Sequence, residues 1–219
     1  MYDLLNYLKN PVYNTRREPR LKYFLFLFFI SFLAALLFGI ISNIICTQFQ
    51  IKRIESGNLT LLKTILLGII LAPISEEILF RSLLRFKKIN LVLFIAVITT
   101  FIAIAAYDSK LKSVVVLSII LLAFLSLLLI FHGNKIESFI SSNFKYFFYA
   151  TALTFGLLHI FNYTGNIYLI LAFSLIIVGP QIVAGFILGF IRMNYGLVYS
   201  ILFHMAINFF GIILMGHKL

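Results

Sequence analysis

Apolar runs about twenty residues long are the feature that most limits what this chain can fold into. The first extends from Tyr23 to Cys46 without a charged residue, and others follow along most of the 219 residues. A helix rises 1.5 Å per residue, so about 20 apolar residues cross the hydrocarbon core of a bilayer. A soluble domain cannot bury this much apolar surface, because 62% of the residues are hydrophobic and only 11% are charged. The runs predict an all-α, polytopic membrane protein.

Seven such runs are expected to form the transmembrane helices of one bundle. The cluster from Asn162 to Asn166 divides the longest uncharged stretch in two, because Asn and Gly favour turns. We expect a single membrane domain over residues 1–219, with a basic cytoplasmic N-terminus at 1–21. The first run is too long for a cleavable signal peptide and is expected to remain as an anchor helix. The expected spans are 22–47, 60–85, 89–107, 112–132, 145–162, 167–191 and 195–216.

Most of the net charge of +11 comes from Lys and Arg in the short polar segments between these runs. With the N-terminus inside, eleven of them fall on the inner side and six on the outer side, Arg81 set aside. Because cytoplasmic loops carry the excess of basic residues, we expect the N-terminus in the cytoplasm and the chain in the plasma (inner) membrane of a prokaryote. This distribution favours membrane lipids as partners and argues against nucleic acid. The single cysteine, Cys46, permits no internal disulfide.

Two adjacent carboxylates, Glu76 and Glu77, lie inside the second run, and Arg81 follows four residues after Glu77. A charged side chain at the centre of a bilayer costs about 2.5–3.5 kcal/mol on insertion scales, so such groups mark functional sites by default. Glu77 and Arg81 share one helix face and are expected to pair. Glu76 is rotated by about 100° from Glu77, which leaves it free to face a cavity.

Three more polar side chains complete a hydrolytic set: His159 in the fifth span, and His204 and Asn208 in the seventh. At 1.5 Å per residue, Glu76 and His204 each lie about 14 Å from the inner ends of their helices, and His159 about 21 Å. Glu76 is suited to act as general base on a water that His159 also holds, while His204 and Asn208 donate to an oxyanion. The alternative is a Zn²⁺ ion on Glu76, His159 and His204 with one open position.

The three motifs, in this order, resemble those of the CPBP family of intramembrane proteases, which groups type II CAAX prenyl endopeptidases with bacteriocin-processing and immunity proteins (the Abi family). Glu76-Glu77-Ile-Leu-Phe-Arg81 matches EExxxR, Phe155-Gly-Leu-Leu-His159 matches FxxxH, and His204-Met-Ala-Ile-Asn208 matches HxxxN. The glycines of the sixth span and Tyr195-Gly196-Leu197 are similar to the residues that precede the last motif in the family. The resemblance covers roughly 65–211, the expected protease core.

The resemblance implies an intramembrane endopeptidase for a membrane-associated peptide or protein, through CAAX-type or leader-peptide processing. Glu76 and His159 would activate water, and His204 and Asn208 would stabilise the oxyanion. The supporting residues would be Glu77, Arg81 and Phe155. The family is usually described as metal-dependent, and catalysis by glutamate without metal is also proposed for it. The chain departs from the pattern by an insert of two apolar runs, at about 89–132, between the first and second motifs.

Three other interpretations use the same residues. Glu76 and Glu77 would form a structural ion-pair cluster with Arg81. A catalytically silent immunity protein on the same fold would sequester a peptide rather than cut it. A small ion-coupled transporter would use the carboxylates as a proton relay, although no inverted repeat is visible. Glu76→Gln separates hydrolysis from sequestration, because only hydrolysis requires the general base.

Overall fold

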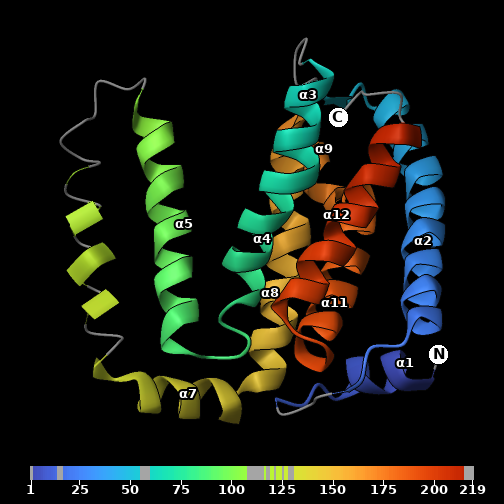
Figure 1. Ribbon diagram of the computed structural model, residues 1–219. Helices are drawn as coiled ribbons and strands as arrows, with labels where there is room; N and C mark the ends of the chain where they lie inside the picture. The colour runs from blue at the N-terminus through green and yellow to red at the C-terminus, as the bar shows by residue number, and fades with distance from the viewer. Residues whose placement is uncertain are drawn as a thin grey trace.

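Helices make up nearly all of the computed structural model, which describes residues 2–13, 17–54, 60–107 and 131–214, with a few more between 116 and 127. The helices are α1 (Tyr2–Lys9), α2 (Leu21–Gln48), α3 (Leu61–Thr64), the π-helix η1 (Ile65–Leu71), α4 (Ala72–Arg81), α5 (Lys88–Tyr107), α7 (Gly133–Ser142), α8 (Phe144–Leu158), the 3-10 helix η2 (His159–Asn162), α9 (Ile167–Ala172), α10 (Ser174–Ile177), α11 (Gly179–Asn194) and α12 (Leu197–Leu214). The starts of α2, α8 and α12 and the ends of α4 and α11 lie at one end of the bundle, and α1 and α7 lie across that end (Figure 1).

The all-α expectation is confirmed, with one small addition. Strands β1 (Lys52–Arg53) and β2 (Tyr163–Thr164) pair antiparallel and join the loop after α2 to the loop after η2. The turn predicted at 162–166 is present: Gly165 adopts a φ of +141°, and the Asn166 side chain accepts a hydrogen bond from the Tyr168 amide at 3.0 Å. These two features close the end of the bundle opposite α1.

The expected spans correspond to continuous helices in most places. α2, the α3–η1–α4 helix, α5, α8 with η2, and α12 lie where spans were predicted. The sixth expected span, 167–191, is broken into α9, α10 and α11, with interruptions at Phe173 and Val178. The fourth, 112–132, lies largely outside the described residues. Among those described, Leu21–Gln48 and Phe144–Asn162 are the helices long and apolar enough to cross a bilayer by themselves, so the number seven stays a prediction.

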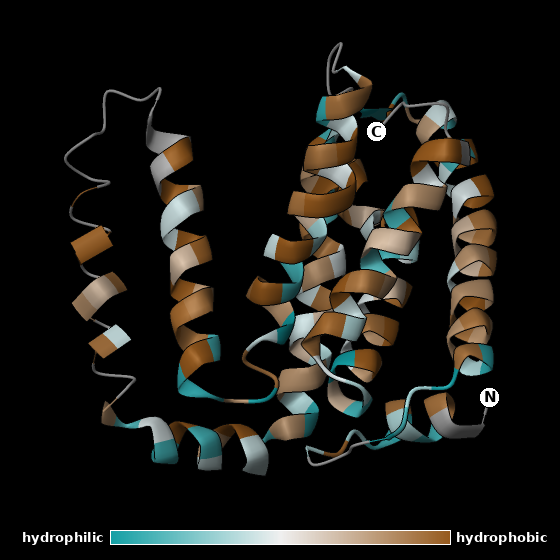
Figure 2. Ribbon diagram, viewed as in Figure 1, coloured by the Kyte–Doolittle hydropathy of each residue, from teal (hydrophilic) through white to brown (hydrophobic). Residues whose placement is uncertain are grey.

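The surface of α2 shows why these helices need a lipid environment. The side of this helix seen in Figure 2 is mostly apolar, its sequence has no continuous polar face, and only Leu27, Ser31 and Ser42 are buried by the rest of the protein. Large side chains such as Phe29 and Ile40 are each 61% exposed. A contiguous apolar surface of this extent is stable only against another protein or the acyl chains of a bilayer.

Close packing of α8 against α11 forms the centre of the bundle. A Cβ atom on Gly185 would lie 2.6 Å from the Ala152 carbonyl oxygen, and one on Gly156 would lie 2.8 Å from the Ile182 Cα. Hydrogen is therefore the only side chain that fits at these crossings, as expected where membrane helices approach closely. Phe148, Phe155 and Leu188 are almost fully buried beside them.

The N-terminal segment contributes to this core, which the prediction of a basic terminus at 1–21 did not anticipate. α1 is amphipathic and buries Leu4 and Tyr7. The Tyr7 ring packs edge-on against Phe148 and Phe190, at centroid distances of 5.5 and 5.2 Å. α5, from the predicted insert, stands at the side of the bundle next to α4 (Figure 1).

Candidate active site

α4 presents its two adjacent glutamates to different surroundings. Glu77 is fully buried, whereas the Glu76 side chain is 28% exposed. Arg81, one turn later, is also fully buried, and its Nη1 lies 3.7 Å from Glu77 Oε1. The predicted Glu77–Arg81 pair is therefore present, and the rotation of about 100° per residue separates Glu76 from it.

His204 of α12 lies between the two carboxylates. Its Nδ1 is 3.1 Å from Glu77 Oε1, and its Nε2 is 3.6 Å from Glu76 Oε2. The first distance is a hydrogen bond, and because a carboxylate only accepts, Nδ1 carries the proton when Glu77 is ionised. Glu76 and His204 were expected at the same depth in the membrane, and their contact agrees with that expectation.

Ser200, one turn before His204, holds the other oxygen of Glu77. Its hydroxyl is within hydrogen-bond distance of Glu77 Oε2 and lies 3.0 Å from the Leu188 carbonyl oxygen. A hydroxyl has one proton, so it donates to one of these acceptors at a time. Ser200 is fully buried, and sequence reasoning missed it. The available signal was its position four residues before His204, on the same helix face.

Phe155 is the common contact of the three motifs. The Arg81 guanidinium carbon lies 4.0 Å from the centre of its ring, and the His159 and His204 rings lie at centroid distances of 5.1 and 5.6 Å. Arg81 Nη2 also donates to the Gly185 carbonyl at 3.3 Å. A cation over a buried aromatic face gains roughly 2 kcal/mol. Phe155 of the second motif therefore contacts both Arg81 of the first motif and the two histidines.

His159 begins the 3-10 turn η2 and is half-buried. Its Nδ1 lies 2.8 Å from the Phe155 carbonyl oxygen. A carbonyl only accepts, so Nδ1 donates and the Nε2 lone pair is left to accept a proton or a water hydrogen bond. Within the described residues, no hydrogen bond or ion pair joins His159 to Glu76 or His204. Phe155, one turn earlier, makes the contact with His204 instead.

Asn208 is anchored by the π-helix η1. Its Nδ2 donates to the Gly68 carbonyl at 2.8 Å. In a π-helix this carbonyl would pair with the amide five residues later, but that residue is Pro73, which has no N–H. The Ala72 amide pairs with Leu67 instead. Asn208 therefore replaces a missing backbone donor and keeps its second amide hydrogen for a ligand.

The residues proposed for zinc do not fit the ion as they are placed. Tetrahedral zinc needs at least three protein ligands, each about 2.0–2.2 Å from the metal. Glu76 and His204 approach one another, but His159 is not gathered with them. No group of three or more His, Cys, Asp or Glu side chains in the described part of the chain is arranged for a metal ion.

One of the comparisons with known proteins identifies a family. The model of a family described as type II CAAX prenyl endopeptidase Rce1-like matches residues 58–210. This range contains η1, the three motifs and the insert between the first and second motifs. No curated protein and no solved structure matches the chain.

Proposed function

The chain belongs to the type II CAAX prenyl endopeptidase Rce1-like family, whose model covers well over half of it, and we propose that it is an intramembrane endopeptidase for CAAX-type prenylated or other membrane-associated peptides. The family is one of integral membrane proteases, which agrees with the apolar surface of α2. The observation that carries the proposal is the series Glu77, His204, Glu76, in which a buried carboxylate fixes a histidine beside a second, accessible carboxylate.

Glu76 is the proposed general base. It is the more exposed of the two glutamates, and its contact in the described structure is His204 Nε2 at 3.6 Å, too long for a direct hydrogen bond. Glu77 is already held by Arg81, Ser200 and His204, so the structural ion-pair interpretation accounts for Glu77 and not for Glu76. His159 would help to hold the attacking water through its Nε2 lone pair.

His204 and Asn208 are the proposed oxyanion donors. When His204 is protonated, Nδ1 donates to Glu77 and Nε2 donates toward the reacting carbonyl. Asn208 supplies its second amide hydrogen, because the first is held by Gly68. Removing a single donor of this kind typically lowers kcat by about 10²–10³-fold.

Glu76 both accepts and returns a proton during the proposed reaction. Its carboxylate takes a proton from water while the oxygen attacks the scissile carbonyl carbon, giving a tetrahedral oxyanion. Glu76 then gives that proton to the amide nitrogen as the C–N bond breaks and the carbonyl re-forms. The products are a carboxylic acid, which then releases its proton to solvent, and an amine, and the general base is regenerated.

The test measures cleavage of a farnesylated, fluorophore-labelled peptide ending in a CAAX sequence by the purified protein in liposomes. Glu76→Gln keeps the size of the side chain and removes the base, so kcat is expected to fall by about 10²–10⁴-fold. Glu137→Gln is the matched control, because Glu137 is exposed on α7 and contacts Tyr13, away from the site. Peptide binding is measured in parallel by fluorescence polarisation.

Full cleavage by Glu76→Gln would refute the assignment of the base. Equal peptide binding by both proteins, with no cleavage by either, would favour sequestration. Comparative terminal proteomics of membranes from cells carrying the wild type or Glu76→Gln then identifies native substrates, because their uncut forms accumulate only with the variant.

A further inference from the structure

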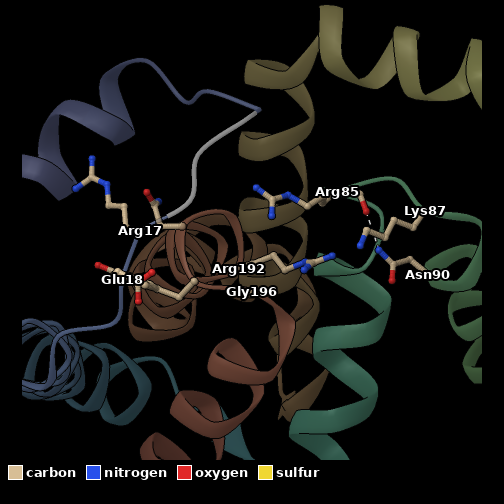
Figure 3. Close-up of a pocket in the computed structure, with 9 residues that line it drawn as sticks. Arg17, Glu18, Arg85, Lys87, Asn90, Arg192 and Gly196 are labelled. Atoms are coloured by element: carbon tan, nitrogen blue, oxygen red, sulfur yellow. Dashed lines mark hydrogen bonds between the residues drawn. The ribbon is translucent and has the colours of Figure 1, made fainter.

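A second polar site lies at the end of the bundle where α1 and α7 are found. It is a pocket of about 470 Å³. Three segments far apart in the sequence surround it: the stretch before α2, the connection from α4 to α5, and the turn from α11 to α12 (Figure 3). Four cationic side chains line it against one carboxylate. The lining residues are Arg17, Glu18, Arg85, Lys87, Asn90, Arg192, Asn194, Tyr195 and Gly196.

Arg192 is the buried cation of this pocket. It is only 6% exposed, and its Nε and Nη2 donate to the backbone carbonyls of Arg81 and Ser82, at 2.9 and 3.4 Å. No described carboxylate lies within ion-pair distance of it, so Nη1 is left for a ligand in the pocket. Burial and the neighbouring Arg85 lower the pKa of Arg192 to about 10. A buried cation beside another cation is stabilised by a bound anion.

Asn194 adds an unused acceptor. The residue is 1% exposed, and its Nδ2 donates to the Phe190 carbonyl at 2.9 Å. Its Oδ1 is buried and has no hydrogen-bond donor in the described part of the chain. A buried acceptor without a donor costs about 1–3 kcal/mol. A ligand with both an anionic group and a hydroxyl would satisfy Arg192 and Asn194 together.

The pocket continues toward the lipid-facing surface. A second hollow, of about 640 Å³, shares Arg17, Glu18 and Tyr195 with the first and extends to the start of α2. There the lining adds two more cations and two aromatic rings, from Arg20, Lys22, Tyr23 and Phe26. Leu25, which lies between Tyr23 and Phe26 in the sequence of this helix, is 60% exposed. Cations at the end of an apolar helix are in position to contact the headgroup of a phospholipid while its acyl chains lie along the helix.

We propose that this pocket binds the phosphate group of an acidic phospholipid, with Lys87 and Arg192 beside the phosphate and Asn194 accepting from a headgroup hydroxyl. The site is distinct from the glutamates and histidines of α4 and α12, and the proposal does not depend on proteolysis. Because Arg192 holds the carbonyls that end α4, a bound lipid braces the helix that carries Glu76.

The experiment titrates delipidated protein in neutral detergent with a short-chain phosphatidylglycerol, a short-chain phosphatidylcholine, or inorganic phosphate. Dissociation constants come from the shift in thermal midpoint. Each cation near an acidic headgroup contributes about 1 kcal/mol, so Lys87→Gln is expected to weaken phosphatidylglycerol binding about fivefold. Lys88→Gln is the matched control, since Lys88 is adjacent and exposed but does not line the pocket.

Tighter binding of phosphatidylglycerol than of phosphatidylcholine, weakened at Lys87 and not at Lys88, supports the proposal. Equal binding of both lipids, or equal weakening by both lysine substitutions, would overturn it. Inorganic phosphate that binds as tightly as the lipid would assign the pocket to free phosphate and reject the lipid. The midpoint of each variant without ligand shows whether the substitution has altered the fold.

Discussion

Gly185→Ala tests whether the close approach of α8 and α11 positions the site. The added Cβ would lie 2.6 Å from the Ala152 carbonyl oxygen and 3.2 Å from Phe155 Cδ1, whereas ordinary contacts begin near 3.4 Å. The backbone oxygen cannot rotate away, so the helices must separate by about 0.8 Å. Overpacking of this kind costs about 1–3 kcal/mol, against a gain of about 0.5–1 kcal/mol from replacing a helical glycine.

We therefore expect Gly185→Ala to lower the free energy of unfolding by about 1–2 kcal/mol. Cleavage should fall as well, because Phe155 is the contact shared by Arg81, His159 and His204. The assay is unfolding in mixed micelles, together with the peptide-cleavage rate.

Gly39→Ala in α2 is the control for the same chemical change. Among the described residues, no atom outside the adjacent backbone of α2 lies within 4 Å of its Cβ position, so stability should stay constant or rise by about 0.5–1 kcal/mol. If the Gly185 variant is as stable and active as the wild type, or if Gly39→Ala is equally destabilising, the packing argument is wrong.

Two further predictions concern single hydroxyl groups. Ser200→Ala should lower the free energy of unfolding by about 1–3 kcal/mol, because Glu77 loses a buried donor; equal stability of the variant and the wild type in chemical unfolding would contradict this. Burial and the charge of Glu137 raise the pKa of Tyr13 above its usual 10.0, so above about pH 10 the unfolded chain releases this proton while the folded chain keeps it. Stability should fall as pH rises through that range, and Tyr13→Phe should show a shallower fall in chemical unfolding from about pH 9 to about pH 11; identical slopes would refute it.

Local periodicity explains which features were predictable from sequence. The Glu77–Arg81 pair follows from a spacing of four residues, and the separate environment of Glu76 follows from the rotation per residue. The turn at 162–166 follows from its Asn and Gly residues. The break at Phe173 was not predicted, because the apolar composition continues through it. At Val178, Pro180 allows α11 to begin, because its missing N–H is tolerated at the start of a helix.

The sequence by itself determined that the chain is a helical membrane protein, which residues carry charge inside it, and which of them share a helix face. These properties depend on hydrophobic run length and on 3.6 residues per turn, both of which are local. Only the tertiary structure decided that Ser200 holds Glu77, that Asn208 replaces the donor missing at Pro73, and that Arg192 holds the end of α4. Such contacts join residues more than a hundred positions apart. They depend on the distance and the rotation at which the helices cross. Glycines at the contact surfaces permit a close crossing, but helix periodicity does not specify its geometry.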